Sequence, residues 1–133
     1  MNPTTLRAVA ATLQAAPEGS RELDARCARA IGRLYGMRGY SNVDFWLHAE
    51  EEFCSSPPWT TSLDASRALA KELLPSIMIS SSCYKNECSA TVWIFLPEVH
   101  AKTEPLACMA AILLALAAKI AREANAPVCE AVG

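Results

Sequence analysis

Blocks of Lys or Arg, zinc-ligand patterns and catalytic signatures are all missing from this chain of 133 residues. Its 12 basic and 14 acidic residues give a net charge of −2 with no cationic cluster. Roles that coat duplex nucleic acid or bind membrane surfaces depend on basic patches, so both are disfavoured. A small anionic ligand stays possible, because it needs only two or three local cations.

Catalytic motifs are the second absence. The sequence has no GxSxG, no HExxH, no P-loop and no dinucleotide fingerprint. Two Cys–His pairs are conceivable, Cys54 with His48 and Cys83 with His100, and nothing in the sequence fixes either pair in space. We therefore expect no enzyme activity, no cofactor and no metal site.

Targeting and membrane-spanning segments are also missing. The N-terminus, MNPTTLRAVAATL, has no cationic start followed by a long apolar run, as a signal peptide would. The longest apolar run, Leu106 to Ala118, has thirteen residues, and crossing a bilayer takes about 20. We predict that this run is a buried helix and that the protein is cytoplasmic, where thiols stay reduced.

What the sequence does contain is a hairpin pattern over residues 77–95. Apolar and polar residues alternate there with a period of two, around a turn at Lys85-Asn86, where a central Asn tolerates positive φ. The resulting register places three pairs opposite each other: Tyr84 and Glu87, Cys83 and Cys88, and Ile79 and Val92. Because a lone hairpin is marginal in water, other elements must pack on its apolar face.

The chain has six cysteines and no CxxC. Cys27 and Cys108 lie on apolar helix faces and are expected to be buried. Cys83 and Cys88, as cross-strand neighbours, offer a disulfide or half a metal site as alternatives. A reducing compartment argues against both, so we interpret the pair as free thiols.

Four helices surround the hairpin in the predicted fold. They cover residues 4–16 with Thr4 as a possible cap, residues 20–32 with Ser20 as the cap, a helix that opens after residues 59–62 and stops at Pro75, and residues 106–123. Residues 43–47 alternate as a third strand, and residues 97–102 are predicted to be a loop. The sequence therefore predicts a single α+β domain, with a three-stranded antiparallel sheet layered with about four helices.

Three segments carry a family resemblance: Ser20-Arg21-Glu22-Leu23-Asp24, Trp59-Thr60-Thr61-Ser62-Leu63-Asp64-Ala65, and Glu104 to Ala111. In this order, around a strand and a hairpin, they resemble the phage ABA-sandwich domain proteins, small phage and prophage proteins without an established activity. The resemblance implies an α-β-α layering and a phage origin, which places the expected cytoplasmic location in a host cell. It covers residues 20–123, so that residues 1–19 contain an added helix and residues 124–133 form a tail.

The start of the third helix is the predicted ligand site. Free N–H groups at residues 61–63 and the helix dipole favour a phosphate or carboxylate, aromatic rings offer stacking surfaces, and arginines can pair with a phosphate. The candidate residues are Arg33, Arg38, Tyr40, Trp46, Trp59, Thr60, Thr61 and Ser62. The alternative is that Thr-Thr-Ser only caps the helix and Trp59 only packs onto it.

Two functional hypotheses follow. In the first, a small phage accessory protein without catalysis sequesters a nucleotide-like signalling ligand and so antagonises host defence. In the second, the protein is an interaction or self-assembly module that binds a host or phage protein, or itself. This hypothesis is based on the mixed hairpin face with Tyr84, Trp93 and Phe95, and on a sheet edge that, if open, invites strand addition.

Overall fold

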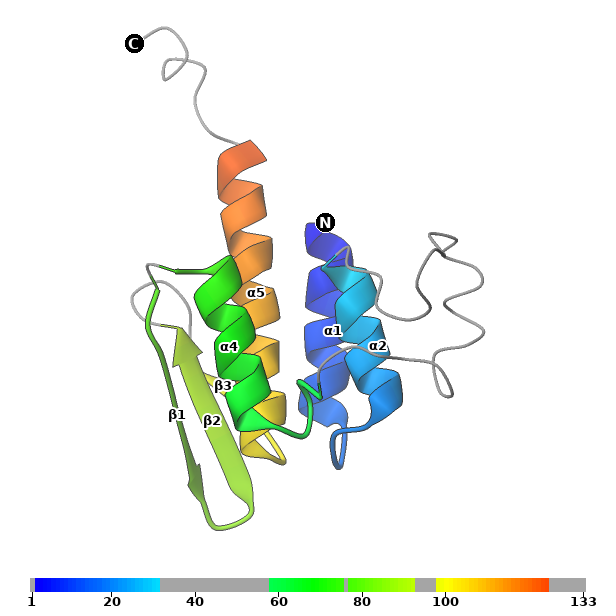
Figure 1. The fold of residues 1–133 in the computed structure, drawn as a ribbon, viewed down its shortest axis with the longest axis vertical. Coiled ribbons are helices and arrows are strands. Elements are labelled where there is room, and N and C mark those ends of the chain that lie inside the picture. Colours follow the sequence, from blue (N-terminus) through cyan, green and yellow to red (C-terminus); the bar gives the residue numbers. More distant parts are fainter. Residues whose placement is uncertain (1, 32–57, 76, 93–97, 125–133) are drawn as a thin grey trace, which may run out of the picture.

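The structure is a computed structural model that describes residues 2–31, 58–75, 77–92 and 98–124. In chain order the described elements are α1 (Pro3–Ala15), α2 (Arg21–Ala30), α4 (Leu63–Leu73), β1 (Ile79–Tyr84), β2 (Glu87–Val92), β3 (Val99–Ala101) and α5 (Glu104–Ala124) (Figure 1). Four helices and a three-stranded antiparallel sheet confirm the predicted α+β class. The strand predicted at residues 43–47 lies outside the described residues.

The hairpin has the predicted register throughout. Tyr84 pairs with Glu87, and the remaining pairs follow from there to the far end of β1. The positive φ falls on Lys85, at 56°, and not on the neighbouring Asn as predicted. Both primed hairpin turns place a positive φ at the first central position, so the turn still matches the twist of its strands.

The third strand comes from a segment that was predicted to be a loop. Val99–Ala101 pairs antiparallel with β2 and makes the strand order β1-β2-β3, so the loop prediction is wrong for these three residues. Their inward side chains, Val99 and Ala101, are buried, whereas His100 between them is exposed. Three residues give one period of alternation, which is too short to recognise in a sequence.

All four described helices lie on one side of the sheet. Helix α5 lies between the sheet and α1, α4 runs beside α5, and α2 packs on α1 (Figure 1). The inward residues of β2 are buried (Cys88, Ala90 and Val92), whereas its outward residues are exposed or half-buried. An α-β-α order requires a helix on the outer face as well, and no described helix lies there.

Helix α5 is the centre of the core. Small alanines along it let α1 approach closely, because the distance between helix axes depends on the side chains at the contact. Leu6 and Leu13 of α1 and Met109 and Leu113 of α5 are fully buried, and α1 and α5 pack against each other. By length and composition α5 is able to cross a membrane, yet 61% of its apolar window is buried inside the fold. This burial agrees with the predicted core helix.

Helix starts follow the expected capping chemistry with one change. Ser20 caps α2 by accepting a hydrogen bond from the N–H of Leu23 at 3.1 Å, as predicted. Helix α1 is capped by Asn2, whose Oδ1 accepts from the N–H of Thr4 at 2.8 Å, so the predicted Thr4 cap is wrong. Pro3 explains the shift, because proline favours the first helical position and places the cap just before it.

Candidate functional site

The segment predicted to bind a ligand is largely turned into the protein. The Trp59 side chain is 1% exposed, so both faces of its ring are covered by protein. Thr60 is fully buried, Ser62 caps α4 by accepting from the N–H of Ala65 at 3.2 Å, and Thr61 is exposed. Arg33, Arg38, Tyr40 and Trp46 lie outside the described residues, so the complete ligand site stays a prediction.

Thr60 joins the N-terminal helices to the rest of the fold. Its N–H and its hydroxyl both donate to Oδ1 of buried Asp24, at 2.8 and 2.6 Å. The same hydroxyl accepts from the N–H of Ser20 at 3.0 Å, and Arg21 pairs with the other carboxylate oxygen at 2.8 Å. Gly19 completes the contact, because a Cβ there would overlap the Thr60 carbonyl. We call Gly19, Ser20, Asp24 and Thr60 the Asp24–Thr60 joint.

Three backbone N–H groups of this segment, those of residues 60–62, are also engaged. The N–H groups of Thr61 and Ser62 donate to the carbonyl of Pro58, at 3.2 and 2.8 Å, and that of Thr60 donates to Asp24. A helix start binds an anion through free N–H groups, so the engaged ones are not available to a ligand. Residues 59–62 therefore act as a cap and a joint in the described structure.

At the outer edge of β1, in contrast to residues 60–62, backbone groups face away from their neighbouring strand. Among the strands that the structure describes, β1 lies at one end of the sheet and pairs with β2 alone. Because the residues flanking a two-residue turn form a hydrogen-bonded pair, Tyr84, Ser82 and Ser80 bond to β2. The N–H and C=O groups of Ile79, Ser81 and Cys83 consequently face the open edge.

One contact confirms this direction. The carbonyl of Ile79 accepts a hydrogen bond from Nη1 of Arg67 on α4, at 3.4 Å. Among the described residues, no hydrogen bond reaches the outward N–H groups of Ser81 or Cys83. An edge of this kind is a template for another strand.

A groove of about 430 Å³ runs between α4 and the start of β1. Its lining residues are Asp64, Arg67, Ala68, Ala70, Lys71, Leu74, Pro75, Ile77 and Ile79. The floor is apolar, while two cations and one carboxylate lie on the α4 side. We call this the α4–β1 groove. Its residues were absent from the predicted site, because the groove arises from the spacing of α4 and β1 and leaves no motif in the sequence.

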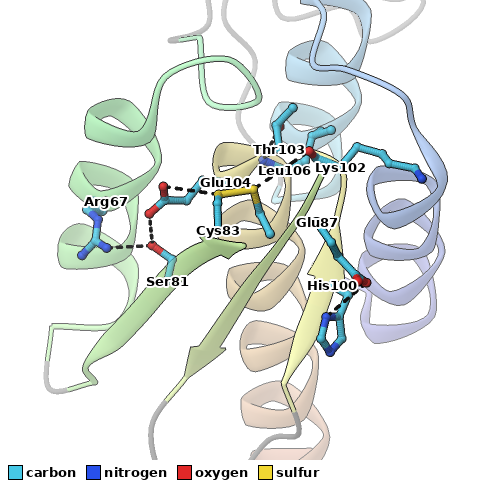
Figure 2. Close-up of a disulfide and its surroundings, with 10 residues drawn as sticks. Arg67, Ser81, Cys83, Glu87, His100, Lys102, Thr103, Glu104 and Leu106 are labelled. Atoms are coloured by element: carbon cyan, nitrogen blue, oxygen red, sulfur yellow. Dashed lines mark hydrogen bonds and ion pairs between the residues drawn. A yellow bond between two sulfur atoms is a disulfide. The ribbon is translucent and has the colours of Figure 1, made fainter. Parts of the chain in front are cut away.

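A line of polar side chains connects the groove to a disulfide (Figure 2). Arg67 donates to the hydroxyl of Ser81 at 2.8 Å, and that hydroxyl donates to Oε1 of Glu104 at 2.7 Å. The other oxygen, Oε2 of Glu104, lies 3.7 Å from Sγ of Cys83. Three elements, α4, β1 and α5, therefore meet at the Ser81 hydroxyl.

Cys83 and Cys88 form a disulfide across β1 and β2 (Figure 2). This corrects the interpretation of the pair as free thiols, although the register that makes the bond possible was predicted. Cys83 is exposed, whereas Cys88 is 6% exposed and lies 4.0 Å from the carbonyl of Lys102. Free thiols were predicted because a reducing compartment was expected, although the predicted register already placed Cys83 opposite Cys88.

The two other described cysteines are buried thiols, as predicted. Burial raises the pKa of the Cys27 thiol far above its ordinary value, and Asp24 adds to that effect. Burial also raises the pKa of Cys108. Both thiols therefore stay un-ionised and unreactive at neutral pH. No group of potential metal ligands occurs among the residues that the structure describes.

A second hollow, of about 700 Å³, lies at the tip of the hairpin. Charged residues of both signs line it, and His100 lies 3.4 Å from Glu87, another lining residue, and 3.0 Å from Glu98, which lies outside the lining. His100 is thereby directed to carboxylates, and Cys83 is bonded to Cys88, so these two do not form the conceivable Cys–His pair.

Comparison with known proteins identified no relative of this chain. No protein-family model, no curated protein and no solved structure matches this chain.

Proposed function

We propose that this protein is a non-catalytic interaction module that binds an extended segment of a partner protein along β1. The observation that carries the proposal is the combination of an open strand edge with an adjacent apolar groove. Strand addition takes affinity from main-chain hydrogen bonds and specificity from pockets for alternate side chains. Strand addition first requires outward backbone groups, which Ser81 and Cys83 supply, and then a pocket, which the α4–β1 groove supplies.

The lining of the groove indicates the chemistry of the bound segment. A strand added to β1 directs alternate side chains toward the helices, where Leu74 and Ile79 offer an apolar floor. Lys71 is exposed on the groove wall and makes no ion pair with the other described residues. We therefore infer a partner segment with an apolar side chain in the groove and a carboxylate near Lys71. In the setting that the family resemblance implies, the partner is a host or phage protein.

Sequestration of a nucleotide-like ligand remains a separate prediction. Trp59, Thr60 and Ser62 act as buried packing, joint and cap in the described structure. The contacts of the described residues therefore support the interaction module more than they support nucleotide sequestration.

Two substitutions at one position test the proposal. Ser81→Pro removes the outward N–H while leaving the bonds to β2 in place, and proline is tolerated at an edge facing solvent. Ser81→Ala removes the same hydroxyl but keeps the N–H, so it is the matched control. Short peptides that bind the wild-type protein are first selected from a displayed library. Their affinity for the wild type and for both variants is then measured.

We expect the selected peptides to combine an apolar residue with a carboxylate. Their affinity should fall at least about tenfold with Ser81→Pro and change only a few-fold with Ser81→Ala, because main-chain pairing carries the affinity. Equal binding to both variants, or no selected peptide at all, contradicts the proposal.

A further inference from the structure

The structure assigns a redox switch to the Cys83–Cys88 disulfide, which controls the order of β1 and so its capacity to take up another strand. The consequence for binding rests on the proposed function, whereas the chemistry of the switch does not. Three observations carry the inference: the position of the disulfide, the unequal exposure of its two cysteine residues, and the acceptors placed beside each sulfur.

The position is the first observation. Strand β1 has no fully buried residue and, within the described part of the chain, one neighbouring strand, whereas β2 is buried at every inward position. Cys83 lies on β1 itself, at a position whose N–H and C=O face the open edge. The covalent bond to Cys88 therefore attaches a weakly held strand to a firmly held one, next to the groups that a partner strand would use.

The unequal exposure of the two cysteine residues favours one route of reduction. A dithiol reductant in its thiolate form attacks Cys83, because Cys83 is exposed and Cys88 is 6% exposed. A bond forms between the reductant and Cys83, the Cys83–Cys88 bond breaks, and Cys88 leaves as a thiolate that takes up a proton. The second thiol of the reductant then displaces Cys83, so the products are two protein thiols and an oxidised reductant. A disulfide oxidant such as oxidised glutathione reverses the exchange.

The third observation is that the reduced form is also accommodated. Oε2 of Glu104 lies 3.7 Å from Sγ of Cys83, and the carbonyl of Lys102 lies 4.0 Å from Sγ of Cys88 (Figure 2). Both oxygens accept hydrogen bonds, so each thiol formed by reduction has an acceptor already in place. The two oxidation states thus fit one backbone, and the difference between them is the cross-link that holds β1.

Hydrogen exchange by mass spectrometry tests the switch on the whole chain in its oxidised and dithiothreitol-reduced forms. We expect exchange in peptides covering residues 79–84 to accelerate at least about tenfold after reduction, while α1 and α5 stay unchanged. The double variant Cys83→Ser/Cys88→Ser should behave like the reduced wild type in both redox conditions. Identical exchange of β1 in the two forms overturns the switch.

A substitution at Glu104 gives a second test, whose expected result does not follow if the disulfide is only structural. Its carboxylate next to Cys83 repels an attacking thiolate, so Glu104→Gln should be reduced several-fold faster than the wild type. Because this effect is electrostatic, the difference should shrink as salt rises. Glu98→Gln, a carboxylate elsewhere on the surface, is the control and should not change the rate. Equal rates for all three proteins, or a difference that salt does not alter, contradict the assigned attack at Cys83.

Peptide binding separates this inference from the proposed function. If selected peptides bind the oxidised and reduced forms equally, the interaction module stands and its regulation is wrong. If β1 loosens on reduction but no peptide binds either form, the switch stands and the proposed function is wrong.

Discussion

Residues 59–62 and strand β1 both carry several hydroxyl side chains, and the protein uses them in opposite ways. In the first segment the Thr60 hydroxyl is directed inward to Asp24 and Trp59 is buried. In β1 the outward backbone groups of Ser81 and Cys83 have no partner among the described residues. Polar groups that are already satisfied hold a fold together, whereas unsatisfied ones on an exposed edge are free to bind another chain.

Truncating the tryptophan of the buried segment should have the largest effect. We expect Trp59→Ala to lower the free energy of unfolding by about 4 kcal/mol, because it removes a large, fully buried side chain and leaves a cavity. Thr61→Ala, two positions away and exposed, is the control and should change stability by less than about 0.5 kcal/mol. Denaturant unfolding measures both. A stable Trp59→Ala variant that has lost only ligand binding would restore the nucleotide hypothesis.

Removing the buried carboxylate of the Asp24–Thr60 joint should lower the free energy of unfolding slightly less than Trp59→Ala does. Asp24→Ala leaves the N–H of Thr60 without its acceptor, removes the nearer of the two acceptors of the Thr60 hydroxyl, and breaks the ion pair with Arg21. The expected loss is about 3 kcal/mol, measured by denaturant unfolding. Glu22→Ala, which breaks an exposed pair with Arg26 in the same helix, should cost less than about 0.5 kcal/mol. Equal losses for the two variants would show that the joint is not structural.

Removing the disulfide should lower the free energy of unfolding by an intermediate amount. The cysteines are five residues apart, and closing so short a loop stabilises a fold by about 2 kcal/mol through the unfolded chain. We expect Cys83→Ser/Cys88→Ser to lose that amount in denaturant unfolding while circular dichroism shows the helices unchanged. A global loss of helix would mean that the hairpin is required for the core, and β1 would then not be a separable edge.

A charge reversal in the α4–β1 groove should have the smallest effect on stability. Lys71 is exposed, so Lys71→Glu is expected to change the free energy of unfolding by less than about 0.5 kcal/mol. Its effect should appear in binding instead, as a loss of affinity for acidic peptides that salt also weakens. Lys85→Glu, at the hairpin turn and outside the groove, is the matched control. If both reversals weaken binding alike, the groove has no specific part in it.

The sequence predicted the hairpin register correctly because alternation over a long run leaves one consistent pairing. The strand Val99–Ala101 was missed, since three residues do not show a period. Residues 59–62 were assigned to a ligand because caps, joints and anion sites use the same residue types. Only the position of Asp24, 36 positions away in the chain from Thr60, distinguishes these roles. The α4–β1 groove likewise depends on the distance between two elements, which local sequence does not encode.

Amide-resolved hydrogen exchange of the oxidised protein, followed by NMR, tests the contrast between the two segments most directly. The account predicts rapid exchange at Ser81, slow exchange at Ser82, which pairs with β2, and slow exchange at Thr60, which is bonded to Asp24. Protection of Ser81 equal to that of Ser82, or rapid exchange at Thr60, would contradict an open β1 edge and a closed joint.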